Sequence, residues 1–294
     1  MITNENLSYY CNNFYGYGSW ENNYWVLALE ESVESNSLNN IVDVKINRFW
    51  DNQYTSDNLI DNHLFQMDLV DANGDEYARF LNPNHHNFAI QNTWRRPIQL
   101  ISAIINQFND MQLVPDEIVS EMILNRWGRS LHDVIGISLI ELYPLPLPKH
   151  SPGSFTDFYN PIQYHPHQFN IHAANFMQDQ LTYKHNLQQI RFDYLINKII
   201  ENKPSFILAM GISDYLLFFE NLTGRFGQEN ININSHLNQV LVTRQNGTNL
   251  TIHQYNIMWG GINNNVTKII VTWQPTRAMD WAYWNSILNI LQNE

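Results

Sequence analysis

Acidic side chains lie at two points where a buried strand of this chain is expected to end. Glu30 and Glu31 directly follow the apolar run Tyr24–Leu29, and Glu141 lies within the apolar run Gly136–Pro148. In a parallel sheet, ligands bind beyond the carboxyl ends of the strands. When two carboxylates share one crevice, the charge of one raises the pKa of the other, because like charges disfavour ionisation. The two pKa values then differ, which suits the pair to acid–base chemistry. The alternative is that each carboxylate caps the following helix or pairs with a nearby arginine.

Polar and aromatic groups also follow the other expected strand ends. Tyr143 comes just after Glu141 in the second apolar run. Two further runs, Pro204–Gly211 and Thr267–Pro275, end in or are followed by chemically useful residues, which are Gly211, Ser213, Trp273, Gln274 and Arg277. If the four runs are neighbouring parallel strands, Glu30, Glu141 and Gln274 converge on one crevice.

The segment TWRR places an indole and two guanidinium groups at the start of an expected helix. Thr93 or Asn92 is its predicted cap, and Trp94, Arg95 and Arg96 fall in its first turn. A helix N-terminus flanked by arginines is suited to receive a phosphate group. The alternative is that Trp94 belongs to the core and the arginines pair with acidic side chains.

The sequence does not predict a metal or cofactor site. Paired acids could hold a divalent cation, but no EF-hand loop and no helical pair of histidines accompanies them. The histidines that stand close together, His85, His86, His165 and His167, do not form a recognisable ligand set. Cys11 is the only cysteine, which excludes an intrachain disulfide and a cysteine zinc cluster. The segment GYGSW lacks the spacing of a dinucleotide fingerprint and precedes its strand.

The charge of the chain argues against tight general binding to nucleic acid. The 294 residues carry 16 Lys and Arg against 28 Asp and Glu, a formal net charge of −12. Nucleic-acid-binding proteins usually present a basic face, because neutralised phosphates supply most of the affinity. The same acidity gives no support for docking on an anionic membrane. No secretory signal or transmembrane run is visible, so the expectation is a cytoplasmic protein that does not contact a membrane.

Apolar runs alternate with segments of helical periodicity along the whole chain. We expect helices at Ser37–Trp50, from Asn92 to Phe108, at Asp116–Trp127, at Asn186–Glu201 and from Met279. The segment Gln239–Tyr255 predicts a hairpin that turns at Asn246–Gly247. A long irregular loop is expected between Pro148 and Pro166. This alternation predicts one α/β domain over residues 1–294 with loop insertions, built as a three-layer α/β/α sandwich around a central, mostly parallel sheet.

The motifs at the strand ends resemble, in order, those of the uracil-DNA glycosylase-like superfamily. That family ends its first strand in Gly-x-(Asp/Asn/Glu)-Pro-(Tyr/Gly), and ALEES at Ala28–Ser32 occupies this position. LIELYPLP at Leu139–Pro146 is similar to the strand whose end reads the base in the family, with Glu141 nearest that position. TWQPTR at Thr272–Arg277 resembles the family's His-Pro motif, with Gln274 in place of His.

The resemblance implies hydrolysis of an N-glycosidic bond of a nucleobase, in DNA or in a nucleoside-like substrate. By position, Glu30 would hold the attacking water and Gln274 would donate a hydrogen bond to the leaving base. The residues expected to contact the substrate are Glu141, Tyr143, Trp94, Arg95 and Arg277. The family also stacks an aromatic ring on the base, and Phe49, Trp50 and Tyr143 compete for this role. No cofactor is implied.

The motifs depart from the family pattern at four positions. Ala28 replaces Gly, Glu31 replaces Pro, Ser32 replaces the last residue and Gln274 replaces His. The alternative function is therefore a catalytically inactive descendant of the fold that binds a ligand or a protein partner. Consecutive side chains of an extended segment point to opposite sides, so Glu30 is assigned to the crevice and Glu31 to its wall or to the first turn of the next helix. If the protein binds DNA, we expect Arg95, Arg96 and Arg277 on one rim.

Overall fold

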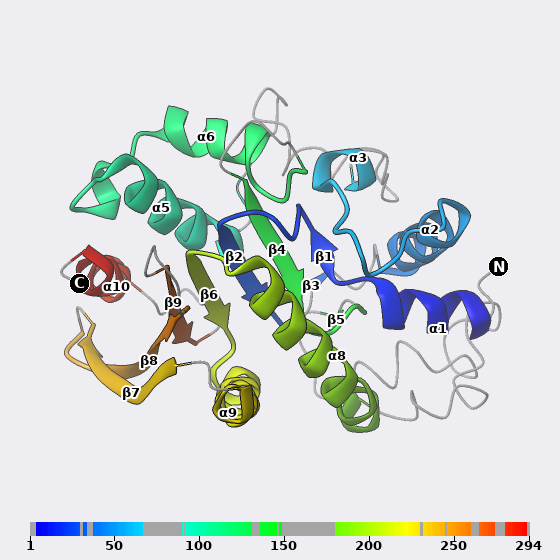
Figure 1. The fold of residues 1–294 in the computed structure, drawn as a ribbon. Coiled ribbons are helices and arrows are strands. Elements are labelled where there is room, and N and C mark those ends of the chain that lie inside the picture. Colours follow the sequence, from blue (N-terminus) through cyan, green and yellow to red (C-terminus); the bar gives the residue numbers. More distant parts are fainter. Residues whose placement is uncertain are drawn as a thin grey trace.

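A seven-stranded sheet runs through the centre of the molecule in the computed structural model (Figure 1). Its strands lie in the order β1-β4-β2-β6-β9-β8-β7, and the two short strands β3 (Ser32–Val33) and β5 (Leu147–Pro148) pair separately. The structure describes residues 4–29, 32–33, 38–66, 90, 92–130, 136–145, 147–148, 180–229, 232–244, 246–259, 265–273 and 280–292.

The four apolar runs form neighbouring parallel strands, as the sequence predicts. They are β2 (Tyr24–Ala28), β4 (Ile137–Glu141), β6 (Phe206–Met210) and β9 (Val266–Thr272). β2 pairs in parallel with β4 on one side and with β6 on the other, and β6 pairs in parallel with β9. Every residue of β4 and β6 is buried, which explains why β6 is apolar throughout and β4 is apolar except for the buried Ser138 and Glu141.

The sheet as a whole is mixed, which corrects the expectation of a mostly parallel sheet. β7 (Asn232–Thr243) and β8 (Asn249–Met258) form an antiparallel hairpin, and β8 continues antiparallel onto β9. The predicted turn at Asn246–Gly247 is confirmed, with Gly247 at φ 78°. An Asn-Gly turn joins antiparallel strands, so the hairpin extends the parallel centre without a crossover helix.

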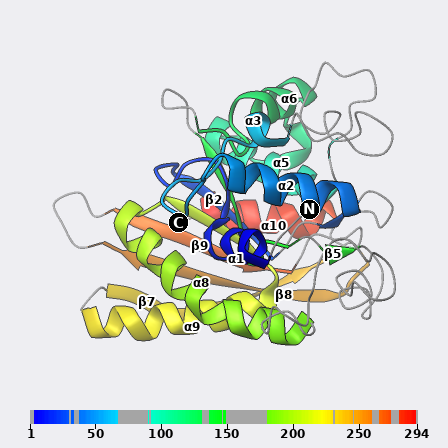
Figure 2. The ribbon, with the colours of Figure 1, turned by 90° about the vertical axis from the view of Figure 1, so that its right-hand side faces the viewer.

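Helices cover both faces of the sheet (Figure 2). α8 (Gln180–Asn202) and α9 (Ile212–Glu229) lie on one side, and α5 (Asn92–Asn106) and α6 (Asp116–Asn125) lie on the other, with α10 (Trp281–Gln292) packed on α5. α1 (Asn4–Asn13) packs against α2 (Leu38–Asp51) beyond the β1 edge. The short elements are α3 (Asn62–Gln66) and η1 (Met111–Leu113). None of the described helices is long and apolar enough to cross a membrane.

The expected helices are confirmed. α8 begins six residues before the predicted Asn186, and α6 ends two residues before the predicted Trp127. Within the described residues, three further α-helices, α1, α3 and α9, and the 3-10 helix η1 were not predicted from the sequence. The loop expected up to Pro166 lies largely outside the described residues.

The glycines of GYGSW are required by the backbone of β1 (Gly16–Tyr17), which pairs antiparallel with β4. Gly16 has φ 124° and Gly18 has φ 116°, a region that favours glycine. A Cβ on Gly16 would lie 2.0 Å from the Leu139 carbonyl oxygen, and a Cβ on Gly18 would lie 2.7 Å from Ser138 Oγ. Both glycines therefore serve a close backbone contact with β4.

A buried arginine connects α8 with the end of β4. Arg191 is fully buried, and its guanidinium donates hydrogen bonds to four carbonyl oxygens. Cys11 and Phe14 accept at 3.0 and 2.9 Å, Glu141 accepts at 2.6 Å, and Leu142 accepts through the Arg191 Nε. These bonds satisfy carbonyl groups that would otherwise be buried without a donor.

Cys11 is expected to be unreactive in the folded protein. Its side chain is fully buried beside Arg191. Burial raises the pKa of the thiol to about 12, and the nearby Arg191 charge lowers it by less. Because the thiolate is the reactive species, a thiol reagent at pH 8 should label the native protein very slowly. Labelling should become rapid in denaturant, and rapid labelling of the native protein would contradict this assignment.

Candidate functional site

The carboxyl ends of the parallel strands meet at one edge of the sheet. The backbone N–H groups of Leu142 and Tyr143 donate to the carbonyl oxygens of Ala28 and Leu29 at 2.8 and 2.6 Å. The N–H of Gly211, after β6, donates to the Thr272 carbonyl at the end of β9, at 2.9 Å. The structure therefore brings the expected strand ends together.

Tyr143 joins the end of β4 to the start of α9. Its hydroxyl donates to Asp214 Oδ1 at 2.9 Å, and the Lys184 ammonium lies 4.5 Å from its ring centroid. Its side chain is only 1% exposed, so the ring does not offer a stacking face in this structure. The hydroxyl of Tyr215, one residue after Asp214, donates to the Ala28 carbonyl at 2.6 Å. These two tyrosines fix the relative positions of β2, β4 and α9.

Glu141 is the last residue of β4 and is 5% exposed. Its Cα is paired with that of Ala28 in the sheet register, which places it beside the ALEES segment. Its backbone N–H donates to the Tyr15 carbonyl at 2.9 Å, and its own carbonyl accepts from Arg191. The main chain at Glu141 is thus held on both sides.

The TWRR residues contact neighbouring helices. Trp94 is half-buried against Trp127, with 6.1 Å between ring centroids. Arg95 is half-exposed and lies 4.0 Å from the Asp116 carboxylate. The Arg96 guanidinium lies 3.5 Å from the ring centroid of Trp281, at the start of α10. Arg95 and Arg96 therefore already have protein partners.

The first turn of α10 links Arg96 to the carboxyl end of β9. The Tyr283 and Thr272 hydroxyls are hydrogen-bonded to each other. Burial raises the pKa of Tyr283 to about 12, and hydrogen bonds from Thr272 and from the Trp273 backbone offset part of that rise. Tyr283 therefore stays protonated. Arg96 stacks on Trp281, which lies two residues before Tyr283. Arg96 is thus on the side of the molecule where β9 ends.

Several predicted site residues lie outside the described residues. They are Glu30 and Gln274, assigned to catalysis, Arg277, assigned to substrate binding, and Glu31. The histidines that did not predict a metal site, His85, His86, His165 and His167, also lie outside the described residues. The expected common rim of Arg95, Arg96 and Arg277 stays a prediction. Among the described residues, no group of three or more His, Cys, Asp or Glu side chains is placed to hold a metal ion.

Trp273 is an aromatic residue that the sequence analysis did not assign to stacking. It directly follows β9 and is 44% exposed. Phe49 is instead buried among Tyr9, Tyr10 and Phe14, and Trp50 packs edge-on against Tyr9 at 5.3 Å between ring centroids. Trp273 could have been selected from the sequence, because it is an aromatic residue that directly follows an apolar strand.

No known protein family, curated protein or solved structure matches this chain.

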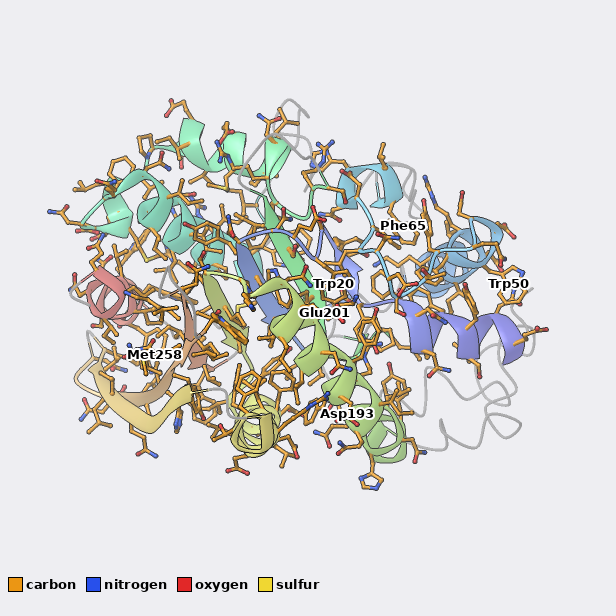
Figure 3. The ribbon with its side chains drawn as sticks, viewed as in Figure 1. Trp20, Trp50, Phe65, Asp193, Glu201 and Met258 are labelled. Atoms are coloured by element: carbon orange, nitrogen blue, oxygen red, sulfur yellow. The ribbon has the colours of Figure 1, made fainter. Side chains whose placement is uncertain are left out.

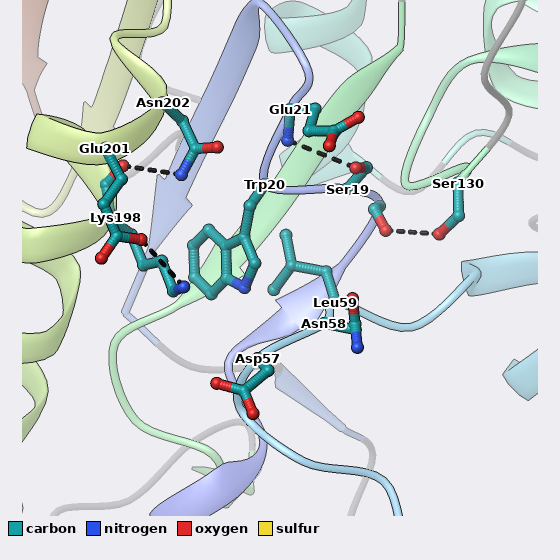
Figure 4. Close-up of a pocket in the computed structure, with 11 residues that line it drawn as sticks. Ser19, Trp20, Glu21, Asp57, Asn58, Leu59, Ser130, Lys198, Glu201 and Asn202 are labelled. Carbon is teal, nitrogen blue, oxygen red and sulfur yellow. Dashed lines mark hydrogen bonds and ion pairs between the residues drawn. The ribbon is translucent and has the colours of Figure 1, made fainter.

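A pocket lies at the opposite edge of the sheet, where β2, β4 and β6 begin (Figure 4). The Phe206 N–H donates to the Asn23 carbonyl at 3.1 Å, and Trp25 Nε1 donates to the Asn22 carbonyl at 2.7 Å, which fixes this edge. The pocket has a volume of about 360 Å³ and is lined by Gly18, Ser19, Trp20, Glu21, Asp57, Asn58, Leu59, Ser130, Lys198, Glu201 and Asn202. The sequence analysis selected none of these residues as functional.

Proposed function

We propose that the carboxyl edge of the sheet binds a nucleobase-containing ligand and that the protein hydrolyses the N-glycosidic bond of that ligand. The observation that carries the proposal is the meeting of the ends of β2, β4, β6 and β9 at one edge. Leu29 immediately precedes Glu30, and Trp273 immediately precedes Gln274. The two catalytic positions therefore follow strand ends that share this edge.

In the proposed reaction, water attacks the sugar carbon that bears the base. The carboxylate of Glu30 orients the water and accepts its proton as the new carbon–oxygen bond forms. The bond between sugar carbon and base nitrogen breaks, and its electron pair leaves with the base. The Gln274 amide donates a hydrogen bond to the base oxygen that gains negative charge. Trp273 supplies an exposed ring on which the base stacks.

A nucleoside-like substrate fits this edge better than duplex DNA. A base in a duplex must be extruded at a cost of a few kcal/mol, and phosphate contacts must hold the backbone. The net charge is −12, and the two described arginines on α5 are engaged by Asp116 and by Trp281. A free nucleoside or nucleotide needs neither extrusion nor an extended basic surface.

The test is release of free base from a panel of substrates, followed by chromatography. The panel contains nucleosides and DNA oligonucleotides with uracil, hypoxanthine or alkylated bases. Glu30→Gln should lower turnover by about a hundredfold or more, the usual scale for loss of a positioned base. Its stability should change by less than about 1 kcal/mol, because the side chain keeps its shape.

Glu31→Gln is the matched control, because it removes the same charge from the adjacent position. It should retain most of the turnover. Equal losses in both variants would refute the assignment of Glu30. Absence of base release from every substrate by the wild type, with nucleoside binding that is lost in Trp273→Ala, would support the non-catalytic alternative instead.

A further inference from the structure

The pocket at the amino edge is built from a rigid floor and a charged rim. Trp20 and Leu59 supply the apolar floor, and Trp20 Nε1 donates to the Ser56 carbonyl at 3.0 Å. The indole also packs against Trp25, with 5.4 Å between centroids. Because Trp20 is held by a hydrogen bond and by a second aromatic ring, the floor is formed before any ligand arrives.

The wall of the pocket next to the floor is also fixed by hydrogen bonds. The Ser138 hydroxyl donates to the Ser19 carbonyl, and the Ser130 hydroxyl donates to the Gly18 carbonyl. The Glu21 N–H donates to Ser19 Oγ at 3.2 Å. The segment that carries Trp20 and Glu21 is therefore tied to β4 and to the residues after α6. A volume of about 360 Å³ is within the range of small-molecule sites.

Four charged side chains surround this floor, and three of them are acidic. The Lys198 ammonium is 3.0 Å from Glu201 and 5.9 Å from the Trp20 ring centroid. Partial burial alone would lower the pKa of Lys198, but hydrogen bonds and charges from Glu201 and Tyr194 raise it above its ordinary value. Lys198 thus stays charged, and Glu201 neutralises it.

The other two carboxylates, Glu21 and Asp57, give the pocket an excess of negative charge. Both are exposed, and neither makes an ion pair within the part of the chain that the structure describes. Figure 4 shows them on opposite sides of the Trp20 indole. The whole protein carries −12, which raises the local concentration of cations.

We infer that this pocket binds a small linear organic cation of the aliphatic diamine class. Its ammonium groups would pair with Glu21 and Asp57, and its methylene stem would pass over the small exposed parts of Trp20 and Leu59, which are 5% and 7% exposed. An ammonium beside an indole gains a cation–π attraction, and Lys198 already occupies such a position. A carboxylate ligand would meet three acidic side chains, and a neutral polyol would leave the excess charge unmatched. The inference concerns the edge opposite the proposed catalytic site and does not depend on that site.

The experiment is calorimetric titration of the full chain with a four-carbon α,ω-diamine at low salt. The diol and the dicarboxylate of the same length serve as matched ligands. We expect saturable binding of the diamine only. The double substitution Glu21→Gln with Asp57→Asn should weaken binding about tenfold or more, because two carboxylate contacts are lost.

A second double variant separates the pocket from the general acidity of the protein. Glu117→Gln with Asp193→Asn also removes two exposed charges, on α6 and on a part of α8 away from Glu201 (Figure 3). It should bind the diamine as the wild type does. Equal weakening in both double variants, binding of the diol or dicarboxylate with similar affinity, or absence of diamine binding to the wild type would overturn the inference.

Discussion

Replacing Arg191 by Met is expected to destabilise the protein by at least about 3 kcal/mol, because the loss of a buried charge with four hydrogen bonds leaves its partners unsatisfied. The guanidinium donates to the carbonyls of Cys11, Phe14, Glu141 and Leu142, which belong to α1, the segment after it and the end of β4. Methionine fills much of the volume but donates no hydrogen bond. The free energy of unfolding should be measured by urea denaturation.

Two further substitutions make the interpretation specific. Arg191→Lys keeps the positive charge, but its single ammonium cannot reach four acceptors as the planar guanidinium does. Most of the loss in the free energy of unfolding should therefore persist in this variant. Arg95→Met removes a half-exposed arginine with one distant ion pair, and its effect should stay within about 1 kcal/mol. If Arg191→Met lowers the free energy of unfolding by less than about 1 kcal/mol, the four carbonyl groups must find other hydrogen-bond donors.

Gly16→Ala should also be strongly destabilising, by more than about 2 kcal/mol. Its φ of 124° is unfavourable for any residue with a Cβ, and the new Cβ would lie 2.0 Å from the Leu139 carbonyl oxygen. Since that oxygen belongs to the backbone of β4, the contact cannot be relieved by rotating a side chain. The expected result is separation of β1 from β4 and a lower midpoint of denaturation.

Gly224→Ala is the matched control, with an expected change of opposite sign. Gly224 lies in α9, and apart from its chain neighbours and the nearby backbone of its own helix no atom lies within 4 Å of the Cβ that alanine would add. Alanine is favoured over glycine inside a helix by roughly 0.5–1 kcal/mol, so this variant should be slightly more stable than the wild type. Similar effects of the two substitutions would contradict the role assigned to Gly16.

The sequence was sufficient to predict the strands at the centre of the fold. β4 and β6 are buried on both faces, so their residues are mostly apolar, with no alternation of apolar and polar side chains. The hairpin was predicted because its Asn-Gly turn is a local signal. α9 was missed although Tyr215, Phe218 and Leu222 follow the spacing of one helical face. β1 has two residues, which is too short for any periodic pattern.

The site could be predicted only as far as its strand ends. Arg191 occupies one position of a long, mostly polar helix, and two of its partners lie 177 and 180 residues away in the sequence. The bond between Tyr143 and Asp214 likewise depends on how β4 and α9 approach each other. Trp20 was discounted because its segment was judged as a dinucleotide motif. No local pattern indicates contacts of this kind, since they arise from tertiary packing.

The position of β2 within the sheet affects when the protein can fold during its synthesis. β2 is made before both of its neighbours in the sheet, which are β4 (Ile137–Glu141) and β6 (Phe206–Met210). At about 5–20 residues per second, the ribosome needs roughly ten to forty seconds to supply both. Until β4 is made the apolar segment Tyr24–Ala28 has neither strand partner, and until β6 is made one of its edges stays unpaired. Unpaired strand edges favour aggregation, so the nascent chain is most exposed to it before β6 has left the ribosome.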